Sequence, residues 1–118
     1  MFCKPLEGGP EEYQTKLTPM KDKATGGMFE LDQSRVNSLS KMRELLSFGG
    51  AMKVYPPIPQ NKGSVFAAAK FGDEIGLVQI NVTSENPPKC LMMICSLNES
   101  FKNVIASAIL DVLSKSKA

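Results

Sequence analysis

Residues 64–83, SVFAAAKFGDEIGLVQINVT, hold two runs in which alternate residues are apolar, joined by an acidic turn at 72–74. Successive side chains of a strand point to opposite faces, so this pattern predicts an antiparallel hairpin with one apolar face. The other face is mixed, because Phe66 and Leu77 stand there beside Lys70 and Gln79. We expect this mixed face to be only partly covered. The apolar face is formed by Val65, Ala67, Ala69, Phe71, Val78, Ile80 and Val82.

Two further elements follow the hairpin. A turn at 84–88 leads into a predicted strand at 89–97, whose apolar run LMMIC favours a central strand covered on both sides. Ser96 and Glu99 have capping-box spacing, and Asn98 is a competing N-cap for a closing helix. An apolar stripe at helical spacing then predicts that this helix packs on the apolar hairpin face. The stripe consists of Phe101, Val104, Ile105, Ala108, Ile109, Val112 and Leu113.

The first half of the chain predicts shorter elements. Residues 10–17 favour a helix that Pro19 ends, and residues 1–9 are expected to be flexible. A turn at 26–27 precedes a strand at 28–31, and Asp32 is expected to cap a helix over 33–47. Gly49 and Gly50 then stop that helix, and a strand at 51–55 ends in a proline-rich connector at 56–59. Together these elements predict one α+β domain over 1–118, with a single antiparallel sheet of about five strands and helices around it.

Composition argues against several classes of function. The chain has no histidine, no phosphate-binding glycine motif, and three cysteines without a CxxC pair. We therefore expect no enzyme activity, no cofactor and no metal site. The net charge is +2 and no basic tract occurs, so nucleic acid is not expected as a partner. No apolar run approaches the roughly 18 residues that cross a bilayer, so no membrane insertion is expected.

The order of elements resembles the C-terminal platform subdomain of adaptor-complex appendages, the ears of the large adaptin chains of vesicle coats. The resemblance spans about 10–113. It is carried by LSFGGA at 46–51, which is similar to the helix-to-strand join of alpha-type appendages, and by SVFAAAK at 64–70, which is similar to a strand of beta-type appendages. The segments IGLVQI and PPKCLMMIC and the closing helix follow in matching order. The resemblance implies an appendage-platform (TBP-like) architecture, and it does not separate alpha-, beta- and AP-3-type chains.

In that family the platform binds short linear motifs of accessory and coat proteins and is not catalytic. The resemblance therefore implies a vesicle-transport role in the cytoplasm, on coated vesicle, Golgi or endosomal membranes through the other subunits of a parent adaptor complex. Such platforms place a tryptophan in the pocket, whereas this chain has none, and Lys16 or Leu17 falls at that position. This departure puts the usual aromatic-motif specificity in doubt. Carried over by position, the peptide-binding residues are Tyr13, Lys16, Leu17, Phe66, Lys70, Leu77 and Gln79.

Three other functions stay open from the sequence. A helix-roofed sheet with seven methionines is compatible with a carrier of small hydrophobic ligands such as lipids. A carboxylate-dependent enzyme and a dimerisation domain that pairs through a sheet edge are the remaining alternatives. The glycine-rich start and early methionine also lead us to expect that the chain is a C-terminal piece excised from a longer protein.

Overall fold

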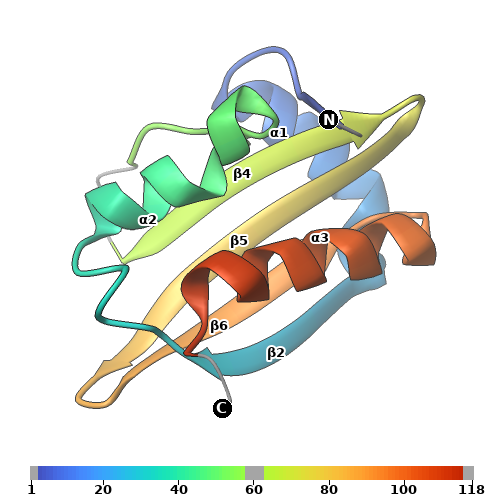
Figure 1. The fold of residues 1–118 in the computed structure, drawn as a ribbon. Helices are drawn as coiled ribbons and strands as arrows, with labels where there is room; N and C mark the ends of the chain where they lie inside the picture. Colours follow the sequence, from blue (N-terminus) through green and yellow to red (C-terminus); the bar gives the residue numbers. More distant parts are fainter. Residues whose placement is uncertain (1–2, 58–62, 116–118) are drawn as a thin grey trace.

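A computed structural model describes residues 3–57 and 63–115. These residues form an α+β domain around one antiparallel sheet, as the sequence predicted (Figure 1). The sheet has the strand order β1-β4-β5-β6-β2, and β3 also pairs with β4. Helices α2 and α3 cover one face, and α1 with the 3-10 helix η1 covers part of the other. The elements are β1 (Lys4–Pro5), α1 (Pro10–Leu17), η1 (Thr18–Lys23), β2 (Ala24–Glu30), α2 (Leu39–Leu46), η2 (Phe48–Gly50), β3 (Lys53–Val54), β4 (Ser64–Phe71), β5 (Glu74–Glu85), β6 (Pro88–Cys95) and α3 (Glu99–Leu113).

The predicted hairpin and closing helix form the main core. Strands β4 and β5 pair from Ser64↔Asn81 to Phe71↔Glu74, with Gly72 at a positive φ of 60° in the turn. Asn98 is the N-cap of α3, because its side chain accepts a hydrogen bond from the Phe101 amide at 3.0 Å. The apolar face of β4 and β5 packs under α2 and α3, with Phe71 as the exception at 54% exposure. A methyl group on Gly76 would overlap Ile105, so α3 lies very close to β5.

The N-terminal segment departs from the sequence expectation in two places. Lys4–Pro5 pair with β4 and Leu6 is buried, so this part of the segment expected to be flexible lies against the sheet. The helix predicted at 10–17 is confirmed as α1, and the chain continues past it as η1, because Pro19 fits the first turn of a new helix. The expected turn at 26–27 is wrong, since both glycines lie inside β2 and pair with β6. Long-range pairing overrides the turn preference of two glycines here.

The helix predicted over 33–47 is shorter and has a different cap. It runs over Leu39–Leu46, and Ser38 accepts the capping hydrogen bond from the Lys41 amide at 3.1 Å. Asp32 instead closes a turn, accepting from the Ser34 amide at 3.0 Å and from Arg35 Nε at 2.9 Å. Asp32 is therefore not the cap of α2. Gly49 and Gly50 adopt positive φ beyond the helix, which fits their predicted role as its stop.

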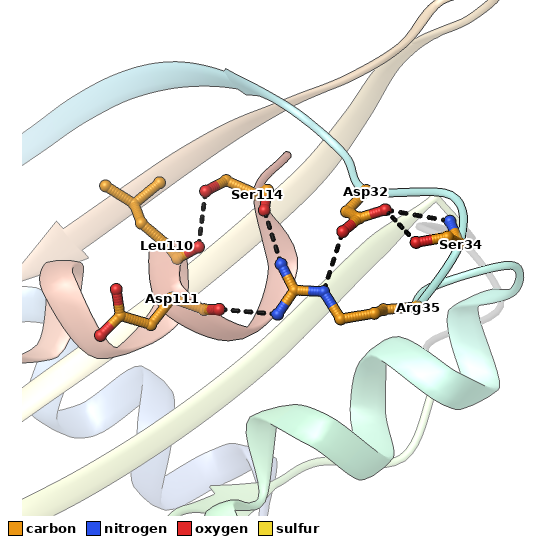
Figure 2. Close-up of polar contacts among 6 residues, drawn as sticks. All are labelled: Asp32, Ser34, Arg35, Leu110, Asp111 and Ser114. Carbon is orange, nitrogen blue, oxygen red and sulfur yellow. Dashed lines mark hydrogen bonds and ion pairs between the residues drawn. The ribbon is translucent and has the colours of Figure 1, made fainter. Parts of the chain in front are cut away.

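Arg35 explains why the chain stays irregular before α2. Its guanidinium donates to the Asp111 carbonyl and to the Ser114 carbonyl, both at 2.8 Å, and so caps the C-terminus of α3 (Figure 2). A cation at this end of a helix complements the helix dipole. The contact ties the segment after β2 to the end of α3. The strand predicted at 51–55 is reduced to Lys53–Val54, and residues 58–59 of the expected connector lie outside the described residues.

Candidate peptide-binding surface

The sheet face opposite α3 is built from rows of cross-strand neighbours. Antiparallel register places Phe66 beside Gln79, Gln79 beside Met93, and Met93 beside Gly26. The next row toward the open end of the sheet contains Ser64, Asn81, Leu91 and Met28. On the other side of the Phe66 row stands a row formed by Ala68, Leu77, Cys95 and Ala24. Side chains of one row are direct neighbours, so each row acts as a unit.

The row of Ala68, Leu77 and Cys95 is closed. All three residues are buried, and they share a cluster with Tyr13 of α1 and Met20 of η1. We call this row and its helical cover the closed half. Leu77 is only 1% exposed, which contradicts the expectation that it lies in a partly uncovered centre.

Tyr13 holds the closed half together. Its hydroxyl donates to the Val78 carbonyl at 3.0 Å, and its ring packs edge-on against Tyr55 at 5.3 Å and Phe66 at 5.6 Å between centroids. Burial raises the pKa of Tyr13 well above its ordinary value, because the phenolate cannot be hydrated there. Burial also raises the pKa of the Cys95 thiol. Neutral, hydrogen-bonded packing is therefore the role that Tyr13 has in this structure.

The two rows beyond Tyr13 are not closed in the same way. Phe66, Gln79, Asn81, Leu91 and Met93 are half-buried, and Met28 is 57% exposed. Their polar groups line up along the sheet, because Gln79 Nε2 donates to Asn81 Oδ1 at 3.1 Å and Ser64 Oγ donates to the same oxygen. We call these two rows the open half. The two amides lie on β5, between Phe66 on β4 and the side chains of Met93 and Leu91 on β6, so the open half combines exposed apolar surface with hydrogen-bonding groups, as small recognition surfaces do.

The predicted binding residues separate into three groups. Phe66 and Gln79 are direct neighbours in the open half, as their positions in the hairpin suggested. Tyr13 and Leu77 are buried, so both contribute to the fold of the closed half and neither is presented to a peptide in this structure. Leu17 is half-buried against the same cluster.

Lys16 and Lys70 lie on the far side of the closed half. Lys70 pairs with Ile75, two rows away from the Phe66 row. Lys16 lines a shallow surface pocket with Ile75 and Leu97, and it forms an ion pair with Glu12 at 3.6 Å. The prediction that Lys70 flanks Phe66 is therefore wrong, because the closed row stands between them.

Sequence reasoning missed Leu91, Met93, Asn81 and Met28. The LMMIC run was predicted to be covered on both sides, but Leu91 and Met93 alternate with the buried Met92 and Ile94 and face the open half. Two features of the sequence indicate this surface once the register is known, namely the polar pair on β5 and the apolar residues that face it on β6. Gln79 and Asn81 put polar atoms on one face of β5, and their partners on β6 are Met93 and Leu91.

Other chemistry finds little support in the described residues. Residues 3–57 and 63–115 hold no group of three or more His, Cys, Asp or Glu side chains that is placed to bind a metal ion. An apolar pocket between η2, β4 and α3 has a volume of only ≈ 60 Å³. Within the described part of the chain, no helix combines the length and the apolar character needed to cross a membrane.

Comparison by sequence identifies no relative. The chain matches no protein-family model and no curated protein.

Proposed function

We propose that this chain is a non-catalytic protein-interaction module that binds short linear peptide motifs through the open half. The observation that carries the proposal is the contrast within one sheet face. Phe66, Leu91, Met93 and Met28 keep exposed apolar surface beside two amides, while the adjoining row is buried. Strands lie about 4.8 Å apart, so the surface from β4 to β2 extends about 14 Å. That length matches about four residues of an extended peptide.

We further propose that the module is the appendage platform of a vesicle-coat adaptor. The element order and the segments at 46–51 and 64–70 support this proposal. Partners would be accessory and coat proteins that carry short motifs, met at coated vesicle, Golgi or endosomal membranes through the parent complex. Because Lys16 or Leu17 falls in place of the pocket tryptophan, we expect a motif different from the usual aromatic one.

Single-motif binding should be weak. Burying one leucine or aromatic side chain yields about 1.5–3 kcal/mol, and ordering the peptide offsets part of that gain. Dissociation constants in the micromolar range or above follow from a few such contacts. Several motifs on one partner would raise the avidity without new contacts.

A library of short peptides from disordered protein regions, displayed and selected on the purified domain, tests the proposal. We expect enriched sequences that share a motif with one or two apolar anchors. Phe66→Ala and Met93→Ala should weaken the best peptide about tenfold, since each removes about 1.4 kcal/mol of contact. Lys70→Ala is the matched control and should leave binding unchanged. No enrichment, or equal affinity in all variants, would contradict the proposal.

The apolar pocket beside α3 does not favour the carrier of hydrophobic ligands. The apolar pocket of ≈ 60 Å³ is far smaller than the roughly 300 Å³ or more of ordinary ligand sites.

A further inference from the structure

The two edges of the sheet are protected very differently. The β4 edge is covered by β1 and β3, two strands of two residues each, and prolines follow β3 at Pro56 and Pro57. The opposite edge is β2, which has seven residues, contains neither lysine nor proline, and pairs with β6 in an unbroken register. Its first five residues are exposed. Short strands and prolines protect an edge from further pairing, whereas β2 is long and contains no proline.

The register fixes which backbone groups of β2 face outward. The Leu31 amide donates to the Pro88 carbonyl at 2.9 Å, so odd-numbered residues direct their N–H and C=O groups toward β6. Even-numbered residues therefore direct theirs away from the sheet. The Lys115 amide confirms this orientation, because it donates to the Glu30 carbonyl from the outer side at 2.9 Å.

The chain itself begins a further strand on this edge. Ser114 forms an antiparallel bridge with Leu31, and the Asp32 amide donates to the Leu113 carbonyl at 2.9 Å. Arg35 fixes this segment by donating to the Asp111 and Ser114 carbonyls (Figure 2). In the part of the chain that the structure describes, this pairing extends to Glu30. Among the described residues, the outward backbone groups of Gly26 and Met28 have no partner.

A groove lies beside the unpaired stretch. It has a volume of ≈ 660 Å³ and is lined by Met28, Phe29 and Glu30 of β2 and by Leu110, Asp111, Ser114 and Lys115 at the end of α3, with Arg35. Lys115 pairs with Glu30 at 3.3 Å, and Arg35 pairs with Asp32 at 2.9 Å. The Asp111 carboxylate has no partner among the described residues, and it points away from Arg35 in Figure 2. The groove therefore offers apolar surface and, among the described residues, one carboxylate without an ion-pair partner.

We propose that the outer edge of β2 is a second binding site, which accepts an extended peptide of a partner protein as an added strand. The peptide pairs with the backbone of Gly26 and Met28. Its apolar side chains lie beside Met28, at the end of the row that contains Leu91, and its basic side chains lie on the α3 side beside Asp111. Side chains alternate along a strand, so the fitting sequence alternates apolar and basic residues. This site stands whether or not the open half binds a motif.

A short peptide fits the edge better than a second copy of the chain. Lys115 already occupies the Glu30 end, so within residues 3–57 and 63–115 the stretch left without a pairing partner on this side runs from Ala24 to Met28. A stable dimer buries about 1,200 Å² or more, and an edge of about five residues supplies only a small part of that area.

Amide NMR of the domain during titration with an acetylated and amidated hexapeptide of alternating lysine and valine tests this site. We expect saturable shifts and slowed hydrogen exchange at the Gly26 and Met28 amides. N-methylation of alternate peptide residues distinguishes an added strand from side-chain contact alone. The peptide that is N-methylated at the positions facing β2 should lose at least tenfold in affinity. The peptide that is N-methylated at the other positions should change less than twofold. Equal effects of the two sets, or no response at Gly26 and Met28, would overturn the proposal.

Two variants separate this site from the open half. Asp111→Asn keeps the main-chain carbonyl that Arg35 contacts and should weaken the lysine peptide about threefold, as an exposed ion pair does. A hexapeptide with glutamate in place of lysine should bind more weakly than the lysine peptide to the unaltered domain. Phe66→Ala should leave the affinity for the lysine peptide unchanged. Loss of binding in this variant would show that the lysine peptide binds to the open half and not to the edge of β2. Concentration-dependent dimerisation with shifts at the same amides, in the absence of peptide, would assign the edge to a second copy.

Discussion

The closed and open halves of one sheet face differ in what lies over them more than in what they are made of. Leu77 and Leu91 stand on neighbouring strands, on the same face and two rows apart. Leu77 is 1% exposed beneath Tyr13 and Met20, whereas Leu91 is half-buried and belongs to neither core cluster of the described residues. The comparison teaches that α1 and η1 divide one surface into a part that stabilises the fold and a part that stays available to a partner.

The same substitution in each half should have very different costs. Leu77→Ala removes a fully buried side chain and should lower the free energy of unfolding by about 2–5 kcal/mol. Leu91→Ala removes a half-exposed side chain and should cost about 1 kcal/mol or less. Urea unfolding at neutral pH measures both. Similar losses in the two variants would mean that the two halves are not distinct.

Alkaline pH should act through Tyr13 of the closed half. Its folded pKa is raised above the ordinary 10.0, so the unfolded chain releases this proton first. The stabilisation is therefore fully present below pH of about 10 and is lost as the pH rises toward the folded pKa.

Tyr13→Phe provides the matched test of this pH dependence. At pH of about 8 it should lower the free energy of unfolding by about 1–2 kcal/mol, because the Val78 carbonyl loses its hydrogen bond. The difference between the two proteins should shrink above pH of about 10, where unaltered Tyr13 ionises on unfolding. Urea titrations across this pH range measure the difference. A constant difference would contradict burial of the neutral phenol.

A smaller effect should separate the amides of the open half from the distant lysine. Gln79→Ala removes a hydrogen-bonding amide from the open half and should weaken the selected peptide by about 0.5–1.5 kcal/mol. Lys70→Ala lies two rows away and should leave the affinity unchanged. Isothermal titration of both variants checks the assignment. If Lys70→Ala had the larger effect, the site would belong on the other side of α1.

Alternation along single strands predicted the hairpin, the closing helix and the side of the sheet on which Phe66 and Gln79 stand. It did not predict which rows α1 covers. That cover depends on the contact between Tyr13 and Val78, which are 65 residues apart. For the same reason Leu77 and Lys70 were grouped with Phe66, although the packing of α1 separates them.

Local sequence signals also gave wrong predictions where a contact between distant segments decided the structure. Asp32 and Ser38 are both suitable N-caps, and the contact of Arg35 with the end of α3 leaves only Ser38 to cap α2. Gly26 and Gly27 favour a turn in isolation but pair with β6 in the folded sheet. The added pairing of Ser114 with Leu31 has no local signal, because it depends on where α3 ends.

Methionine methyl NMR with a soluble paramagnetic probe tests the division of this face most directly, because methionines lie in the closed half, in the open half and in the core. Met20 reports on the closed half, Met28 and Met93 report on the open half, and Met42, Met52 and Met92 report on the core beneath α2 and α3. We predict strong broadening of Met28 and Met93 and little broadening of Met20, with bound peptide restoring the Met93 signal. A Met93 signal as protected as that of Met20 in the free domain would contradict the existence of an open half.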